Sequence, residues 1–227
     1  MNIRSLLSAF ALIGVAVAPT VVAGQITTAQ PTGFLQDYYR LGHVGGVQLE
    51  QVWINPAFDV RAYRTLYVAP TRIDPQAYYR NPQMDHGIAT QISQSLQAQL
   101  TGQLQGAGIF QFVSDDPFFS GKRPQALTLE TRITEIYSGD PQKRYENGFG
   151  AGHTTIQIEG KIVENRTCRT LVEFADRRLN PGDALFIGRA KSANGQYLLN
   201  LDSNGVMRGI VQLFIYLREM GPPANQR

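Results

Sequence analysis

Three glycines at alternating positions form the pattern in this sequence that is most similar to a ligand-binding motif. Gly148, Gly150 and Gly152 stand in the order Gly-Phe-Gly-Ala-Gly. A glycine-rich loop that cradles phosphate follows a strand and opens a helix, whereas the residues after Gly152 alternate in the manner of a strand. Glycines at the entry to a strand usually permit a bulge or close backbone packing. We therefore interpret the three glycines as a structural turn and expect no cofactor.

Aspartates form the second group that could carry chemistry. Asp115 and Asp116 are adjacent and precede Pro117, and Asp37 lies in an aromatic segment. Glycoside hydrolysis needs two carboxylates held about 5–10 Å apart. Adjacent aspartates on a turn more often act as solvated caps of a helix. The sequence therefore predicts no catalytic residue, and a glycan-active enzyme remains the alternative.

The histidines and the single cysteine form no recognisable metal site or nucleophile–base pair. None of the three histidines has a second His or Cys at metal-ligand spacing: His43, His86 and His153. Cys168 has no second cysteine for an internal disulfide and no histidine near it in the sequence. We expect Cys168 on the second strand of a hairpin, as a buried thiol that acts as a small apolar group. No metal site is predicted.

The hairpin from Gly148 to Arg178 is the element around which these residues are organised. Residues 155–162 alternate polar and apolar side chains, turn formers follow at 165–167, and residues 170–174 are again rich in strand formers. The missing side chain of Gly160 leaves room for a packed helix on one face of the first strand. The apolar residues expected on that face are Ile156, Ile158 and Ile162.

Two helices complete the predicted fold. One runs from about Met84 to Gln105 with an apolar residue every four positions, and the other begins at N-cap residues within 200–204 and ends at Met220, before Gly221. Further strands are expected at 63–69, 109–113 and 127–133, with a bulge near Thr134. Loops are expected around Pro75, at 118–124 and at 138–150, and a short apolar segment at 185–187. These elements predict an α+β sandwich domain over residues 61–221, with a mostly antiparallel sheet of about five strands and two helices packed on one face.

Residues 24–60 form an aromatic arm before this domain. The segment 33–41 is an aromatic cluster among turn formers, and residues 47–54 fit a short strand at a sheet edge. Two interpretations stay open: the arm docks its aromatic side chains on the domain, or it presents them to a glycan or a protein partner. The candidate interaction surface consists of Phe34, Asp37, Tyr38, Tyr39 and Trp53.

The first 23 residues have the features of a secretory signal peptide. Arg4 precedes a largely apolar stretch at 6–18, and small residues end at Ala23. The apolar stretch is shorter than the roughly 20 residues of a membrane span. We expect cleavage after Ala23, a periplasmic or secreted mature chain without a transmembrane span, and a short tail at 222–227. The net charge of +3 comes from scattered basic residues, which does not favour a nucleic-acid partner.

Several segments resemble a family of the bacterial envelope. They are residues 33–41, the strand at 63–70, and the glycine turn 148–152 that leads into 163–172. The family is the domain-of-unknown-function family thirty-three thirteen, whose members are small exported proteins, usually lipoproteins. The resemblance covers roughly residues 31–220 and implies an envelope location and a fold rather than an activity. Members typically carry a lipobox cysteine where this chain has Gly24, so no acyl anchor is expected here.

These observations predict a non-enzymatic accessory or interaction protein of the bacterial envelope, with an envelope protein as its unidentified partner. The alternative is a secreted glycan-binding protein or glycan-active enzyme. The sequence leaves the oligomeric state open.

Overall fold

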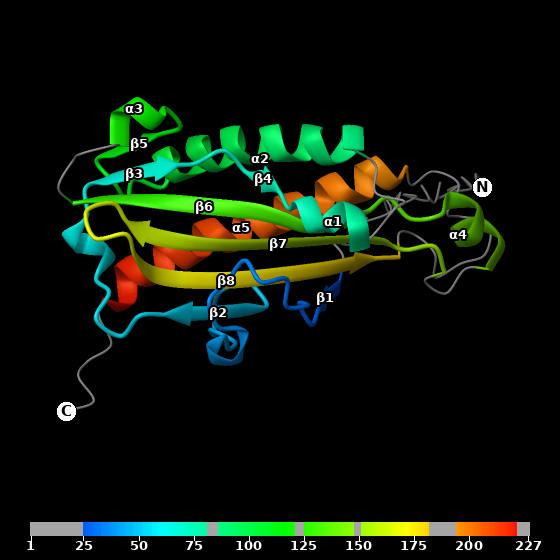
Figure 1. The fold of residues 1–227 in the computed structure, drawn as a ribbon, viewed down its shortest axis with the longest axis horizontal. Coiled ribbons are helices and arrows are strands. Elements are labelled where there is room, and N and C mark those ends of the chain that lie inside the picture. The colour runs from blue at the N-terminus through cyan, green and yellow to red at the C-terminus, as the bar shows by residue number, and fades with distance from the viewer. Residues whose placement is uncertain (1–24, 81–85, 121–124, 148–150, 182–193, 222–227) are drawn as a thin grey trace, which may run out of the picture.

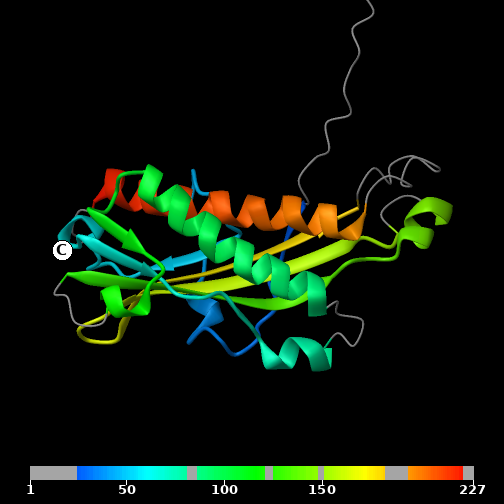
Figure 2. The same ribbon diagram turned by 90° about the horizontal axis from the view of Figure 1, so that it is seen from above.

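One mixed β-sheet with helices on one face forms the framework of the protein. The computed structural model describes residues 25–80, 86–120, 125–147, 151–181 and 194–221. Within this part of the chain the sheet has eight strands. Two long helices cover one face, and residues 29–41 of the N-terminal arm lie on the other (Figures 1 and 2).

The elements have the following bounds. The strands are β1 Gln25–Thr27, β2 Gln51–Ile54, β3 Thr65–Val68, β4 Arg72–Ile73, β5 Phe112–Ser114, β6 Ala126–Tyr137, β7 Thr154–Glu164 and β8 Arg169–Asn180. The α-helices are α1 Pro75–Arg80, α2 His86–Gly106, α3 Pro117–Ser120, α4 Pro141–Asn147 and α5 Gly195–Met220. Two 3₁₀ turns, η1 Tyr38–Arg40 and η2 Val60–Ala62, lie before β3.

The strand order is β1-β8-β7-β6-β3-β5, with β2 also paired to β8 and β4 to β6. β6, β7 and β8 pair antiparallel, whereas β3 pairs parallel with β5 and β6, and β4 pairs parallel with β6. The α+β class is right, but the prediction of a mostly antiparallel sheet of about five strands is wrong. The chain returns from β3 to β5 through α2, and a helical crossover of this kind makes strands parallel. The missed strands β1 and β4 have three and two residues, too few for an alternating pattern.

The helices α2 and α5 pack side by side on the same face of the sheet, as predicted (Figure 2). The apolar side chains of β7 point to this helix face and are buried: Ile156, Ile158 and Ile162. Gly160 stands opposite Phe174 of β8, and a Cβ at this position would overlap the Phe174 ring. The space above Gly160 is therefore filled by an aromatic ring of the neighbouring strand rather than by a helix.

The bulge in β6 is confirmed. The register with β7 shifts between Ile133 and Glu135, and the strand then continues to Tyr137. The strand predicted at 109–113 is displaced, because β5 begins at Phe112. Phe110 instead turns into the core, where its ring meets Phe214 of α5 edge to face at 5.5 Å.

Short helices occupy three predicted loops, so the loop predictions are wrong. α1, α3 and α4 each begin at a proline that follows an aspartate: Asp74, Asp116 and Asp140. The carboxylate of each aspartate accepts the N–H of the residue two positions on, at 2.7, 2.9 and 3.0 Å. An aspartate is a favourable N-cap, and proline fits the first helical position because the N–H it lacks would have no partner there.

Helix α5 begins earlier than predicted. Asn194 is its N-cap and accepts the N–H of Gln196 at 2.9 Å, so the expected caps at 200–204 lie inside the helix. Asp202 is buried against β8, where it accepts a hydrogen bond from Asn180 at 3.0 Å. Gly221 ends the helix with φ +63°, as expected.

Cys168 does not lie on a strand. It is exposed in the turn between β7 and β8 and has φ +57°, so the prediction of a buried thiol is wrong. The apolar segment at 185–187 lies outside the described residues, as do the predicted signal peptide and the predicted tail. Among the described helices, none is long and apolar enough to cross a membrane.

Candidate functional site

The candidate site lies on the face of the sheet opposite α2 and α5, which we call the arm face. Along β7 the side chains alternate, so the positions between the buried isoleucines point to the arm face. They are Thr155, Gln157 and Glu159, and all three are buried. Glu173 of β8 is buried there too. Because buried carboxylates are rare unless they are paired, this polar layer needs partners from the arm.

Glu159 is the centre of these contacts. Its carboxylate is fully buried, and Tyr38 donates to Oε2 at 2.6 Å. The hydroxyl of Thr32 lies 2.9 Å from both carboxylate oxygens. Gln157 and Thr134 add donors from the sheet at 2.7 and 3.2 Å. All of these donors are neutral, so hydrogen bonds rather than an ion pair compensate for the burial of this carboxylate.

The Tyr38 hydroxyl also orders the arm itself. It accepts backbone N–H groups from Thr32 at 3.1 Å and from Gly33 at 3.2 Å. Leu35 follows this turn and is buried against Ala175 of β8 in a small apolar cluster. One phenol thus joins the turn of the arm to the sheet, and the docking of the arm is the interpretation that these contacts support.

Arg40 makes the second attachment. Its guanidinium donates to the buried carboxylate of Glu173 at 2.7 and 3.2 Å, and it stacks over the Trp53 ring at 3.7 Å from the ring centre. Trp53 lies on β2, which pairs with β8 at the sheet edge, as expected for a short edge strand. Tyr38 and Arg40 are therefore both fixed to the sheet, on either side of Tyr39.

Tyr39 is the one aromatic residue of the predicted interaction surface that is completely exposed, at 101 % relative accessibility. It stands in η1, whose N-cap is Asp37; the Asp37 side chain accepts the Tyr39 N–H at 2.9 Å. Asp37 is exposed as well, whereas Phe34, Tyr38 and Trp53 are half-buried. The structure thus divides the predicted surface into residues that hold the arm and residues that it displays.

Burial raises the pKa of the Glu159 carboxyl above its ordinary value, and the donors around it oppose this only in part. At pH values between the pKa of Glu159 in the unfolded state and its pKa in the folded state, the folded state binds more protons than the unfolded state. The free energy of unfolding therefore decreases as the pH rises through this window. Glu159→Gln removes the ionisation. We expect the stability of this variant relative to the wild type to increase from acid to neutral pH, measured by urea unfolding between about pH 4 and pH 8.

Glu164→Gln is the matched control for this measurement. A hydrogen bond from Thr167 is the main cause that lowers the pKa of Glu164, so ionisation of Glu164 favours the folded state. The relative stability of the control should therefore decrease over the same pH range. A relative stability of Glu159→Gln that does not change with pH would contradict the role given to Glu159.

A pocket of about 210 Å³ opens on the arm face beside the docked arm. It lies between Phe34 of the arm and residues of β3, β4 and β6. Phe34 forms one wall, where Arg132 and Lys161 lie 4.3 and 5.0 Å from the centre of its ring. The polar residues that line the pocket are Tyr67, Arg72, Thr128, Glu130, Thr131 and Arg132.

The other candidates from the sequence do not gather at this pocket. Gly148 and Gly150 lie outside the described residues; Gly152 has φ +70° and packs against Asp140, as a turn glycine does. Asp115 and Asp116 are exposed, and Asp116 is the cap of α3.

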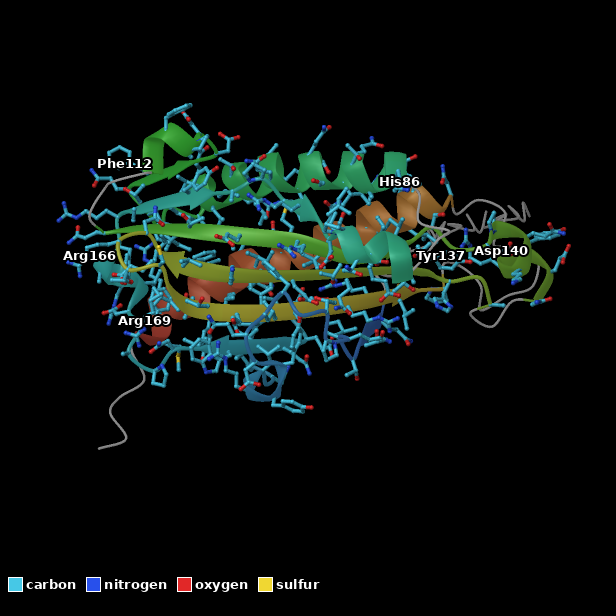
Figure 3. All side chains as sticks on the ribbon, viewed as in Figure 1. His86, Phe112, Tyr137, Asp140, Arg166 and Arg169 are labelled. Carbon is cyan, nitrogen blue, oxygen red and sulfur yellow. The ribbon has the colours of Figure 1, made fainter. Side chains whose placement is uncertain are left out.

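The histidines are exposed in separate parts of the chain, with His86 at the start of α2 (Figure 3). In the described ranges, no three His, Cys, Asp or Glu side chains come together in a way that could hold a metal ion.

Sequence reasoning missed Glu159, Arg72 and Arg132. The sequence did contain one indication: the polar positions of β7 include an amide and a carboxylate in succession, Gln157 and Glu159, in a strand that is otherwise rich in apolar and β-branched residues. Alternation alone predicts that such positions face water.

The fold and the site define an α+β protein whose polar sheet face is covered in part by its own N-terminal arm. The chain belongs to the family described as "Protein of unknown function (DUF3313)", whose sequence model matches residues 30–179. This confirms the family resemblance. The matched region runs from the arm through β8 and thus contains Glu159, its arm partners and the pocket. No curated protein matches the chain.

Three solved structures share a distant likeness with the chain. The dodecamer of PelC from Paraburkholderia phytofirmans is 12 % identical with a TM-score of 0.39, covering 70 % of this chain and 94 % of that one. A Xanthomonas campestris protein of the DUF330 family is 13 % identical with a TM-score of 0.40, covering 74 % and 91 %. A putative neuraminyllactose-binding hemagglutinin homolog from Helicobacter pylori is 10 % identical with a TM-score of 0.40, covering 74 % and 97 %. At these values the likeness carries no functional conclusion.

Proposed function

We propose that this protein is a non-enzymatic accessory protein of the bacterial envelope, periplasmic or secreted, which binds a protein partner through its N-terminal arm. The features of a signal peptide in residues 1–23 support the location. The arm supports the binding role, because its exposed residues stand on a segment that buried hydrogen bonds hold in place.

The observation that carries this proposal is the exposure of Tyr39 between two anchored neighbours. Tyr38 is tied to Glu159 and Arg40 to Glu173, so the backbone of η1 is fixed before any partner arrives. Tyrosine is enriched among the residues that dominate binding energy at protein interfaces. A side chain displayed on a preorganised segment loses less conformational entropy on binding than one on a mobile loop.

Tyr39→Ala tests the proposal. The mature chain would be crosslinked in envelope preparations, captured, and the captured proteins quantified by mass spectrometry. We expect one stoichiometric envelope protein in the wild-type sample and a loss of about tenfold or more with Tyr39→Ala, the scale of a hot-spot residue. Thermal unfolding should be unchanged, because the replaced side chain is exposed.

Phe118→Ala is the matched control for Tyr39→Ala. Phe118 is an exposed aromatic residue on α3, at 95 % relative accessibility, and its loss should leave capture unchanged. Equal capture by the wild type and Tyr39→Ala would overturn the arm as the binding surface.

A second candidate function is glycan binding, which the pocket beside Phe34 favours. Aromatic and polar side chains around a small pocket are a common setting for small ligands. Of the two parts of this alternative, the enzymatic one has less support, because Asp115 and Asp116 lie on an exposed turn and do not line the pocket.

A further inference from the structure

Two arginines stand directly beside each other at the pocket. Arg72 of β4 and Arg132 of β6 are paired across neighbouring parallel strands, and both line the pocket. The neighbouring pair Ile73 and Ile133 packs on the helix side, so the two arginines share the arm face. Like charges in directly opposed positions of a sheet repel each other and destabilise it. Such a pair is therefore a candidate for a function that outweighs its effect on stability.

The acidic groups near the pocket leave part of this positive charge uncompensated. Glu130 already pairs with Lys161 at 3.2 Å. Asp74 lies 3.6 Å from Arg132 and also caps α1. Arg72 is exposed, and within the described residues its guanidinium has neither an ion pair nor a hydrogen bond. The pocket thus presents one unpaired guanidinium beside one that is only loosely paired.

The remaining lining residues suit a compact ligand with both a ring and hydrogen-bonding groups. Phe34, Ala69 and Pro70 supply apolar surface, and Tyr67 adds a hydroxyl group to the lining. Burial and the charges of Asp116 and Asp115 raise the pKa of Tyr67, so this hydroxyl stays protonated and can donate. A volume of about 210 Å³ limits the ligand to the size of a single sugar ring.

We propose that this pocket binds a small organic oxyanion, a carboxylate or phosphate group carried on a ring of about monosaccharide size. Arg72 and Arg132 hold the anion, because guanidinium groups match the geometry of carboxylate and phosphate oxygens. The ring packs against Phe34. This inference names the ligand class of the glycan-binding alternative, and it does not depend on partner binding through Tyr39.

Calorimetric titration of the mature protein at low salt tests the proposal. The probes are glucuronate, glucose 6-phosphate and neutral glucose. We expect saturable binding of at least one of the two anionic probes. A comparison of the affinities for glucuronate and for glucose 6-phosphate distinguishes a carboxylate site from a phosphate site. Binding should weaken as salt is added, because exposed charges are screened. Absence of saturable binding of both anions, or equal binding of glucose, would overturn the proposal.

Arg72→Gln provides the residue-level test, with Arg64→Gln as the matched control. Both arginines are exposed, and Arg64 does not line the pocket. We expect Arg72→Gln to weaken binding by about tenfold or more, the scale for loss of a charged hydrogen-bond partner, and Arg64→Gln to leave it unchanged. Equal affinity of Arg72→Gln and the wild type would overturn the assignment.

Thermal unfolding without ligand separates loss of binding from loss of fold. Because Arg72→Gln removes a repulsion from the pair with Arg132, the unliganded variant should be at least as stable as the wild type. A less stable variant would contradict the repulsion. In the wild type the bound anion should raise the unfolding temperature, and this increase should be absent in Arg72→Gln. If the capture experiment fails to support partner binding through Tyr39, the results expected here for the pocket are unaffected.

Discussion

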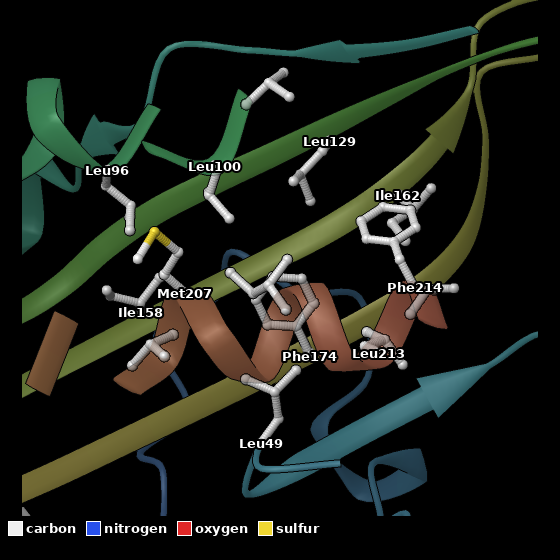
Figure 4. Packing of buried hydrophobic residues seen from close by; sticks show 14 of the residues in the cluster. Leu49, Leu96, Leu100, Leu129, Ile158, Ile162, Phe174, Met207, Leu213 and Phe214 are labelled. Atoms are coloured by element: carbon white, nitrogen blue, oxygen red, sulfur yellow. The ribbon is translucent and has the colours of Figure 1, made fainter. Parts of the chain in front are cut away.

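Phe174→Ala is expected to lower the free energy of unfolding by about 3–5 kcal/mol. The Phe174 ring has no exposed surface and occupies the space that Gly160 leaves on the neighbouring strand. It lies in the core between the sheet and α5, where Leu49, Leu213 and Phe214 are buried as well (Figure 4). Glycine opposite this ring has no side chain that could move into the space, so the substitution leaves a cavity beneath the helix.

Phe118→Ala makes the same chemical change at an exposed site and is the control. We expect it to change stability by no more than about 0.5 kcal/mol in the same urea titration, because its ring already contacts water. A loss below about 1 kcal/mol for Phe174→Ala would show that the sheet and α5 close over the missing ring. The measured difference between the two variants therefore reports the packing that joins β7, β8 and α5.

The parts of the fold that the sequence predicted are those with a long periodic pattern. The β7–β8 hairpin alternates over many residues, and α2 carries an apolar residue every four positions, so each shows its buried face directly. The bulge in β6 was visible for the same reason, because Ile136 breaks an otherwise regular alternation. In each of these elements the apolar side chains that set the pattern are buried in the core.

The elements that the sequence did not predict are short or depend on distant partners. β4 consists of only two residues, Arg72 and Ile73, and they form a strand because they pair with β6. The helices after Asp74, Asp116 and Asp140 had a local signal, the aspartate followed by proline, which outweighs the turn-like composition of those segments.

The candidate site was only partly predictable. The aromatic segment pointed to the arm, but Tyr38 and Glu159 are 121 residues apart, and no local pattern links a phenol to a carboxylate at that distance. The polar face of β7 had the pattern of a strand with one solvated side. The arm that covers this face makes Glu159 a buried residue, and that contact is a property of the tertiary structure alone.

Asp176→Ala is expected to have an effect as large as that of Phe174→Ala, for an electrostatic reason. Asp176 and Arg178 are neighbours on the helix face of β8 and form two hydrogen bonds of 3.0 Å; their side chains are 0 % and 5 % exposed. Arg178 also donates to the backbone carbonyl of Gln48, and Gly205 of α5 has no side chain where the guanidinium lies. Removing the carboxylate leaves a buried cation without its counter-charge, which costs about 3–5 kcal/mol.

The exposed pair Asp59 and Arg61 has the same spacing along the chain and gives the matched control. Arg61 Nε lies 2.8 Å from Asp59 Oδ1, but both side chains are in contact with water. Asp59→Ala should therefore lower the free energy of unfolding far less than Asp176→Ala. The double variant Asp176→Leu/Arg178→Met removes both charges and should recover most of the stability, because no ion is left buried. If the double variant is as unstable as Asp176→Ala, the loss comes from packing against α5 rather than from the unpaired charge. Urea unfolding of the four proteins decides between these causes, and recovery in the double variant would identify the pair as a device that orients β8 on α5 rather than a source of net stability.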